Sequence, residues 1–454
     1  MNLGHRPASS LVFCDGALAG LRLHMLAESP LETACLVLAR AVRLTDGRYR
    51  LVVGEIITLR DADYVARTET RLELTAEVLA DATKRARSEG LALFLAHTHP
   101  VRGSVGPSSI DKHGEKKWVP AVRRRVPDVP HGRLIIGVDS VHAAIIHDDA
   151  TEQAVRVFEV GTNLTVATPT DEPAAVGNPT NQRQVLAFGV DGQRRLDSLH
   201  FGVVGCGGTG SVVVQQLAHL GVRTFTLVDS DVVEASNLNR LVGATVADVG
   251  RPKVDVLKDA ITTTRSTANV RGIRADVCDA ATARLLLDCD FFFCCTDSEG
   301  SRAVLNQLAY QYLLPGIDLG VVIRVREGLV THISGRVQML TPSEPCLVCA
   351  EALDSEQVRR DLLSENARAS DTYIDGAEVP QPAVISINSA AASMAVTMML
   401  AAVTGIPVAS RHQRIRFETG VVTRVSVAAR SACPVCSTGG ALGRADHFQS
   451  PGRR

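Results

Sequence analysis

Residues 199–229 read LHFGVVGCGGTGSVVVQQLAHLGVRTFTLVD, and this stretch decides the fold of the second half of the chain. An apolar run of strand-forming residues leads into a glycine-rich turn, a helical pattern follows, and a second apolar run ends at Asp229. A strand, a helix and a strand in this order predict a βαβ unit with parallel strands. We therefore expect an α/β fold built on a parallel sheet.

The glycine-rich turn predicts a phosphate-binding site. Glycines allow a tight turn, and they let backbone N–H groups approach a phosphate at the N-terminus of the following helix. Asp229 ends the next strand, where a carboxylate can bind ribose hydroxyls. NAD and ATP both contain such a ribose, so both ligands stay open at this point. The glycines of the turn are Gly205, Gly207, Gly208 and Gly210.

Polar residues further along the chain favour ATP over NAD. The segment SNLNRLVGATVADVGRPK contains Asn239, Arg240 and Lys253, and side chains of this kind can bind a triphosphate. A dehydrogenase needs no cationic cluster there. Asp297 follows the apolar run DFFFCC, and a carboxylate at the carboxyl edge of a sheet suits Mg²⁺. A degenerate scaffold of the same fold stays open as an alternative.

These runs together resemble a known family. VVGCGGTGS, LVDSDVVEASNLNR, RPK, CTDS and paired cysteines are similar to the MoeB/ThiF/HesA family of ubiquitin-activating-type adenylyltransferases, over about residues 181–436. The resemblance implies a Rossmann-like fold with a mostly parallel sheet. It also implies ATP-dependent adenylation of the C-terminal carboxylate of a ubiquitin-like or sulfur-carrier protein. By that likeness Asp229 binds the ribose, Arg240 and Lys253 bind the phosphates, and Asp297 binds Mg²⁺.

Further residues take roles from the same resemblance. Asp231 and Asn237 would order the loop that leads to Arg240. In NQRQVLAFGVDGQRRL, Arg183 matches the arginine with which one subunit of the family reaches the active site of its partner, which implies a homodimer. Relatives that form a thioester carry a cysteine after the first cysteine pair, but no cysteine occurs between residues 349 and 433. We therefore expect direct transfer to a conjugating enzyme or a sulfur donor.

Two Cys-x-x-C pairs predict a structural zinc site. Each pair can bind one edge of a tetrahedral Zn²⁺, and four thiolates close its coordination shell. Redox-active dithiols and thiols without a ligand are the alternatives. The other seven of the eleven cysteines are interpreted as core residues or ordinary thiols. The paired cysteines are Cys346, Cys349, Cys433 and Cys436.

A second metal site is predicted in the first half of the chain. His97 and His99 are two residues apart at the end of the apolar run LALFLAHTHP, so both imidazoles face the same side of a strand. Asp111 follows in GPSSIDKHG as a third ligand, which leaves one position of a catalytic zinc open for water. Glu32 lies where a helix-like segment gives way to the expected first strand, and its carboxylate could accept a proton from that water.

This pattern resembles the JAB/MPN metallopeptidases, the JAMM family, over about residues 15–160. The likeness implies that Glu32 is the general acid/base, that His97, His99 and Asp111 bind zinc, and that Ser108 donates to the oxyanion. Members of the family cleave peptide or isopeptide bonds after the C-terminus of ubiquitin-like proteins. Eight residues rather than the usual seven separate the second histidine from the serine. The rival candidates are Glu55 as the base and His113 as the third ligand; a metal site without activity and plain polar side chains also stay open.

Composition and patterning exclude other classes of protein. The chain has 454 residues, 48 basic against 49 acidic side chains and 4% aromatic residues, which disfavours binding to nucleic acid or to an anionic membrane. Residues 379–410 carry no charge, but their small and polar residues favour a buried helix over a membrane span. With no signal-like N-terminus, we expect a cytoplasmic protein with reduced cysteines.

The predicted organisation is an α/β metallopeptidase-like domain at residues 1–160, a linker at 161–180, an adenylyltransferase-like domain at 181–436 and a flexible tail at 437–454. The favoured function is a fused enzyme that both trims or removes a ubiquitin-like protein and adenylates its C-terminus, as in bacterial ubiquitin-like conjugation systems, some of them antiphage. Sulfur-carrier activation for cofactor or amino-acid synthesis is the first alternative. A scaffold that binds ATP and a ubiquitin-like tail without turnover is the second.

Overall fold

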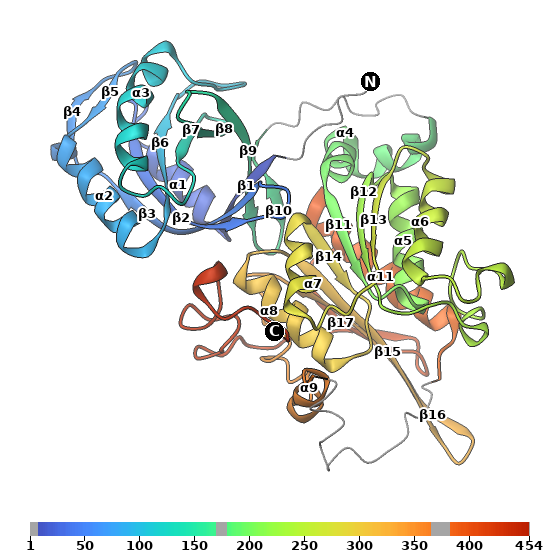
Figure 1. Ribbon diagram of the computed structural model, residues 1–454. Helices are drawn as coiled ribbons and strands as arrows, with labels where there is room; N and C mark the ends of the chain where they lie inside the picture. Colours follow the sequence, from blue (N-terminus) through green and yellow to red (C-terminus); the bar gives the residue numbers. More distant parts are fainter. Residues whose placement is uncertain (1–7, 169–178, 365–381, 454) are drawn as a thin grey trace. The chain divides into compact units, whose positions relative to one another are not determined.

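The computed structural model describes residues 8–168, 179–364 and 382–453. The chain divides into two compact units (Figure 1). Unit 1 comprises Met1–Pro169 and Gly443–Gln449, and unit 2 comprises Thr170–Leu442 and Ser450–Arg454.

Unit 1 is built on a sheet that closes on itself. Seven strands follow one another in the order β1-β3-β2-β6-β7-β8-β9, and β9 pairs in turn with β1, so the strands form a closed barrel. An eighth strand, β10, is added at β9. The strands are β1 (Ser9–Cys14), β2 (Ala34–Arg43), β3 (Tyr49–Thr58), β6 (Ala92–Thr98), β7 (Gly132–Ile136), β8 (Val141–Ile146), β9 (Glu152–Val160) and β10 (Leu164–Val166). A separate two-stranded sheet pairs β4 (Tyr64–Arg67) with β5 (Leu72–Leu74).

Alternation along β6 separates the two apolar layers of unit 1 and orients its histidines. Phe94 and Ala96 join the layer that contains α1 (Ala17–Leu26). Leu93 belongs to the opposite layer, which contains residues of α2 (Ala76–Glu89) and the end of α3 (Ser109–Arg123). His97 points to the same face of the strand as Leu93, because side chains along a strand alternate between faces and these two residues are four apart. The histidine therefore faces the side on which α3 lies.

Unit 2 contains a mixed sheet whose first half is parallel. The order is β13-β12-β11-β14-β15-β16-β17-β18; pairings are parallel as far as β15 and antiparallel beyond it. This confirms the α/β fold with a Rossmann-like sheet for unit 2, although the sheet is mixed rather than mostly parallel. The strands are β11 (His200–Val204), β12 (Thr224–Val228), β13 (Asn269–Ile273), β14 (Phe291–Cys294), β15 (Gly316–Arg326), β16 (Leu329–Leu340), β17 (His412–Arg416) and β18 (Val421–Arg424).

Helices flank this sheet, and the βαβ unit at its centre is the predicted one, with α5 between the parallel neighbours β11 and β12 (Figure 1). Gly221 ends α5 with a φ of 100°, a value that favours glycine. The helices are α4 (Gln182–Ser198), α5 (Gly208–Leu220), α6 (Lys253–Thr264), α7 (Ala280–Arg284), α8 (Glu299–Gln311), α9 (Ser355–Asp361) and α11 (Ile385–Thr404).

The uncharged segment forms α11, which is long and apolar enough to cross a membrane by length and composition. Half of its most apolar window is nevertheless buried inside unit 2, where α11 packs against α4, α5 and β15. Small residues such as Ala391, Ala392 and Ala395 are fully buried in it. This packing is typical of a core helix.

Three local expectations differ from the structure. Strand β1 precedes β2, so the strand after Glu32 is not the first of its sheet. The segment expected to be a linker begins with β10, which pairs with β9; residues 169–178 lie outside the described residues. The segment expected to be a loose tail is anchored, because Arg40 donates to the Gly443 carbonyl at 3.2 Å and Arg453 pairs with Asp279 at 3.0 Å. Polar partners distant in sequence hold these segments.

Candidate functional site

The glycine turn between β11 and α5 leaves the N-terminus of α5 open to a ligand. Gly205 has a φ of 87°, and a Cβ there would lie 2.7 Å from the carbonyl oxygen of Cys295. A Cβ on Gly210 would overlap the Gly205 carbonyl. Gly207, in contrast, has open space where a Cβ would lie, so room exists above the turn. Backbone N–H groups at such a helix start bind phosphate.

Asp229 ties the end of β12 to this turn. Its carboxylate accepts hydrogen bonds from the backbone N–H of Cys206 at 2.6 Å and of Asp231 at 2.8 Å. Burial raises the pKa of Asp229, and the nearby Lys253 ammonium opposes that rise. The carboxylate that is predicted to bind the ribose therefore lies beside the glycine turn, and two backbone donors fix its position.

The predicted cations occupy two positions around the turn. Lys253 is buried at the start of α6 and pairs with Asp231 at 2.7 Å. Arg240 is half-buried and donates to the carbonyl of Ser236 at 2.7 Å. The methylene groups of Arg240 would lie 3.4 Å from a Cβ on Gly208, so its stem passes over the glycine turn. These contacts bring both cations to the loop region next to the turn.

Asn388 is a site residue that sequence reasoning missed. Its side-chain amide nitrogen would clash with a Cβ on Gly208, so it reaches the glycine turn from α11, far along the chain. The residue is buried, with 7% of its surface exposed. The available signal was an amide in an otherwise apolar, small-residue helix. It was interpreted only as evidence against a membrane span.

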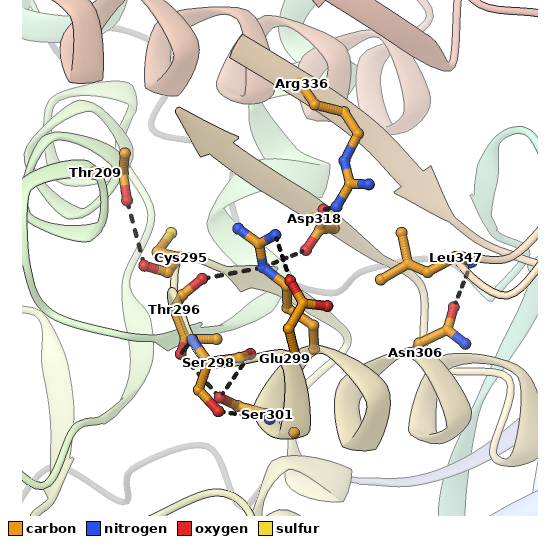
Figure 2. Close-up of polar contacts among 12 residues, drawn as sticks. Thr209, Cys295, Thr296, Ser298, Glu299, Ser301, Asn306, Asp318, Arg336 and Leu347 are labelled. Carbon is orange, nitrogen blue, oxygen red and sulfur yellow. Dashed lines mark hydrogen bonds and ion pairs between the residues drawn. The ribbon is translucent and has the colours of Figure 1, made fainter. Parts of the chain in front are cut away.

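Asp297 lies on a loop that contacts the glycine turn. Cys295 extends β14 by donating its N–H to Val204 at 2.8 Å, and its carbonyl accepts from the Thr209 hydroxyl at 3.3 Å (Figure 2). The Asp297 side chain is exposed, and within the described residues it accepts no hydrogen bond. The predicted Mg²⁺ ligand is therefore a free carboxylate beside the phosphate-binding turn, which fits the role.

The remaining predicted residues of this site are placed differently. Asn237 is buried and accepts from the Glu234 N–H at 3.2 Å, so it orders the loop rather than facing a ligand. Asn239 accepts from Arg240 at 3.1 Å. Arg183 is exposed near the start of α4, which bends at Gly189. The structure does not bring Arg183 together with the other side chains of the site.

The four paired cysteines converge in unit 2. Sγ atoms lie 3.5 Å apart for Cys346 and Cys433, and 3.5 Å apart for Cys349 and Cys436. All four lie within 4.8 Å of one another. Thiolates about 2.3 Å from a tetrahedral zinc would be separated by about 3.8 Å, so the set fits a structural zinc. Hydrogen bonds among the thiols raise the pKa of Cys346 and lower that of Cys436.

Replacing Cys433 by serine is expected to remove about one equivalent of zinc and to destabilise unit 2 by about 3 kcal/mol or more, because structural zinc contributes directly to folding. Metal analysis and thermal denaturation measure both effects. Cys289→Ala is the matched control, because Cys289 is buried in the same unit outside the cluster. Unchanged zinc content in Cys433→Ser would contradict the assignment.

Comparison with known proteins decides the family of unit 2. Residues 181–436, more than half of the chain, match the model of the ThiF family. The chain belongs to the ThiF family. The matched residues include the glycine turn, Asp297 and all four paired cysteines, and they confirm an adenylyltransferase-type domain of the ThiF/MoeB kind in this part of the chain.

Curated relatives match within the ThiF-family part. The chain is 35% identical over 176 residues to the molybdopterin-synthase adenylyltransferase of Escherichia coli (strain K12), covering 38% of this chain and 68% of that protein. It is 30% identical over 161 residues to the SAMP-activating enzyme E1 of Haloferax volcanii, covering 36% and 56%. Among solved structures, MccB of E. coli with ATP has a TM-score of 0.47 at 19% identity, covering 58% of this chain and 76% of that one.

The match to the ThiF family does not cover unit 1, so the candidate site in unit 1 is argued from its geometry alone. His97 Nε2 lies 3.2 Å from Asp111 Oδ1, and His99 Nε2 lies 3.3 Å from Asp111 Oδ2. One ligand atom from each residue falls within 4.8 Å of the others. Glu32 Oε1 is 3.9 Å from His99 Nε2. The structure thus brings together Glu32, His97, His99 and Asp111, four of the five residues that the sequence predicts for this site; the fifth, Ser108, contacts Asp111.

Local structure explains how Asp111 reaches the histidines. Ser108 precedes α3, and its hydroxyl accepts from the Asp111 N–H at 3.1 Å, while the Asp111 carboxylate accepts from the Ser108 N–H at 2.6 Å. This capping box fixes the aspartate at the N-terminus of α3. Burial opposes ionisation, but the close contacts with His97 and His99 hold the pKa of Asp111 well below its usual range.

A metal fits this site. His97 Nε2 is buried and has no hydrogen-bond partner among the described residues, which is costly unless a ligand binds it. Two imidazole nitrogens and one carboxylate are a zinc donor set. Burial raises the pKa of Glu32, and the two histidines oppose that rise. A carboxyl of raised pKa next to the donors suits a general base.

The rival residues lie elsewhere. Glu55 pairs with Arg85 of α2 at 2.7 Å, and it is not among the residues that could share a metal in the described part of the chain. His113 is exposed on α3, two residues beyond Asp111, and does not join the cluster. The extra residue in the preceding loop therefore does not displace Asp111 from the histidines.

Proposed function

We propose that the ThiF-family domain adenylates the C-terminal carboxylate of a ubiquitin-like or sulfur-carrier protein. The observation that carries the proposal is the contact of the glycine turn with the loop of Asp297, with Arg240 across the turn. In the reaction a carboxylate oxygen of the partner attacks the α-phosphorus of ATP. The bond from that phosphorus to the bridging oxygen breaks, and pyrophosphate leaves with the electron pair.

Charge explains the choice of residues. The attacking carboxylate and the triphosphate repel each other, so the site must neutralise charge that accumulates around the α-phosphorus. Arg240 and Lys253 supply positive charge next to the glycine turn, and α5 supplies backbone donors. Mg²⁺ held by Asp297 would shield the phosphate charges. In our proposal Arg183 completes the site from the partner subunit of a homodimer.

Relatives support the class of substrate. One curated relative is named a molybdopterin-synthase adenylyltransferase and another a SAMP-activating enzyme E1. We place the reaction in the cytoplasm, where the cysteines would stay reduced. The activated carboxylate would pass to a conjugating enzyme or a sulfur donor. The segment after the first cysteine pair holds no cysteine in the sequence, and residues 365–381 of it lie outside the described residues.

Pyrophosphate exchange tests this proposal. The purified chain, incubated with MgATP, labelled pyrophosphate and a small β-grasp carrier protein that ends in glycine, is expected to incorporate label into ATP. The same carrier without its last residue is the matched control, because it lacks the correct carboxylate. Exchange at the same rate without the carrier would contradict the proposal. So would the absence of exchange with every carrier that binds the chain.

We propose a second activity for unit 1, a zinc-dependent cleavage of the peptide or isopeptide bond after a ubiquitin-like C-terminus. The buried Nε2 of His97, which makes no hydrogen bond among the described residues, favours it. Zinc bound there would lower the pKa of a water molecule and polarise the scissile carbonyl. Glu32 would accept the proton of the attacking water and pass it to the leaving amine. The Ser108 hydroxyl, which uses its lone pair for the Asp111 N–H, keeps its proton to donate to the oxyanion.

The two activities would share one substrate. Cleavage exposes a C-terminal carboxylate, and adenylation consumes that carboxylate. In the favoured version this pairing serves a ubiquitin-like conjugation system of the bacterial, antiphage kind. Activation of a sulfur carrier for thiocarboxylate formation is the alternative. A scaffold that binds ATP without turnover would fail the exchange experiment.

A further inference from the structure

A buried cluster of charges lies next to the Asp297 loop, and the proposed reaction does not use it. Asp318 on β15 is fully buried and pairs with Arg336 of β16 at 2.7 Å (Figure 2). Arg302 of α8 places its Nε 3.6 Å from the other oxygen of the same carboxylate, and its Nη1 lies 3.8 Å from the Glu299 carboxylate one turn earlier. Two guanidinium groups therefore share one buried carboxylate. Such a cluster is costly to desolvate and needs a reason beyond stability.

Arg302 directs its hydrogen bond to the loop rather than to its ion partner. Its Nε donates to the carbonyl of Thr296, the residue before Asp297, at 3.3 Å. Asp318 Oδ1, in contrast, is buried and accepts no hydrogen bond from the described residues. The Asp318 carboxylate thus holds the guanidinium in place by charge, and the guanidinium holds the loop.

The cluster is also strongly ionised. Burial would lower the pKa of Arg302, but Asp318 together with other nearby acidic groups outweighs burial and raises that pKa. Burial likewise opposes ionisation of Asp318, but Arg302 and Arg336 hold the pKa of this carboxyl below its usual value. Arg302 and Asp318 therefore each favour the charged form of the other, and this attraction holds the guanidinium beside the carbonyl of Thr296.

Neutral contacts complete the support of the loop. The Thr296 hydroxyl lies 2.9 Å from that of Ser301, and the Ser298 N–H donates to the Thr296 hydroxyl at 3.2 Å (Figure 2). Ser298 also donates to Asp361 of α9 at 2.9 Å. Arg302 thus adds to these neutral contacts a charged donor to the backbone carbonyl of Thr296. Its loss should therefore loosen the residue adjacent to Asp297.

We propose that Arg302 is a positioning residue for Mg²⁺-dependent nucleotide binding. It fixes the backbone at Thr296 and thereby the direction of the Asp297 carboxylate, while Asp318 and Arg336 fix Arg302. This inference rests on the proposed adenylation site. It adds three residues, from α8, β15 and β16, that neither contact the nucleotide nor react with it.

The substitution Arg302→Lys separates positioning from charge. Lysine keeps the positive charge near Asp318, but it is a compact ammonium without the guanidinium fork, so it cannot serve both partners in the same way. Asp318→Asn keeps the shape and removes the charge that holds Arg302. Arg271→Lys is the matched control, because Arg271 pairs with Asp288 at 3.3 Å on the exposed edge strand β13.

Calorimetric titration of the full chain with α,β-methylene-ATP tests the proposal. The affinity for the analogue is measured in Mg²⁺ and again in EDTA. Relative to the unchanged chain, Arg302→Lys should bind the analogue about tenfold more weakly in Mg²⁺ and about equally well in EDTA. Asp318→Asn should shift in the same direction, and Arg271→Lys should not. Thermal denaturation of each variant should stay within a few degrees of the unchanged chain.

Three results would overturn the inference. Arg302→Lys could keep the full gain in affinity from Mg²⁺, which would show that the contact with Thr296 does not matter. It could lose affinity equally in Mg²⁺ and EDTA, or unfold at a clearly lower temperature than the unchanged chain. Either result would show that the cluster has only a structural role. If the unchanged chain itself binds no analogue, the proposed adenylation site fails, and this inference fails with it.

Discussion

Asp297→Ala is expected to lower the rate of carrier-dependent pyrophosphate exchange at least 100-fold. The loss of one group that stabilises developing charge in a site excluded from water costs about 3 kcal/mol, which corresponds to a factor of this size. Asp297 is suited to the role because its carboxylate is exposed and unpaired within the described structure, next to a glycine turn that it does not support. Its removal should therefore leave the fold intact.

Controls separate this effect from a loss of stability. Asp255→Ala removes an exposed carboxylate from α6 of the same unit and should leave exchange unchanged. Asp297→Ala should melt at the same temperature as the unchanged chain and still bind the carrier. Exchange retained within threefold in Asp297→Ala would show that this carboxylate is not the Mg²⁺ ligand.

His97→Ala is expected to remove about one equivalent of zinc from unit 1. The substitution deletes a buried ligand nitrogen that makes no hydrogen bond in the described chain, and two remaining ligands bind zinc far more weakly. Zinc at the four-cysteine cluster should remain, so the content should fall by about half. Inductively coupled plasma mass spectrometry on purified protein measures the change.

Two variants separate metal binding from catalysis in unit 1. Glu32→Gln should keep the zinc and lose cleavage of a carrier extended beyond its C-terminal glycine, because the amide cannot accept a proton. His113→Ala is the matched control on α3 and should keep both. If His97→Ala retains the full zinc content, the three-residue site is not a zinc site. Loss of zinc in Glu32→Gln would make the glutamate a ligand rather than a base.

Local patterns were enough to predict the centres of both units. The βαβ unit follows from its alternation of apolar and helical patterns, and the glycine turn follows from the backbone conformation that it needs. The placement of the two histidines on one face also depends only on residues close in sequence. These features agree with the structure because short-range sterics and hydrogen bonding determine them.

Long-range contacts could not be predicted in the same way. Asn388 reaches the glycine turn from α11, and Asp318 meets Arg302 only after β15 is placed beside β14. No periodicity marks such residues, because their roles depend on how distant elements pack. The anchoring of Arg453 to Asp279 was missed for the same reason, since a polar C-terminal segment has the composition of a loose tail.

The most direct test of the central claim is the intact mass of a carrier protein after incubation with the chain and MgATP. The account predicts a carrier that gains the mass of one AMP group at its C-terminal carboxyl, with release of pyrophosphate, and no such product with Asp297→Ala. The carrier can be found by capture on Asp297→Ala or Glu32→Gln and mass spectrometry of its C-terminus. A captured carrier that never acquires AMP, while the unchanged chain binds MgATP, would contradict the account.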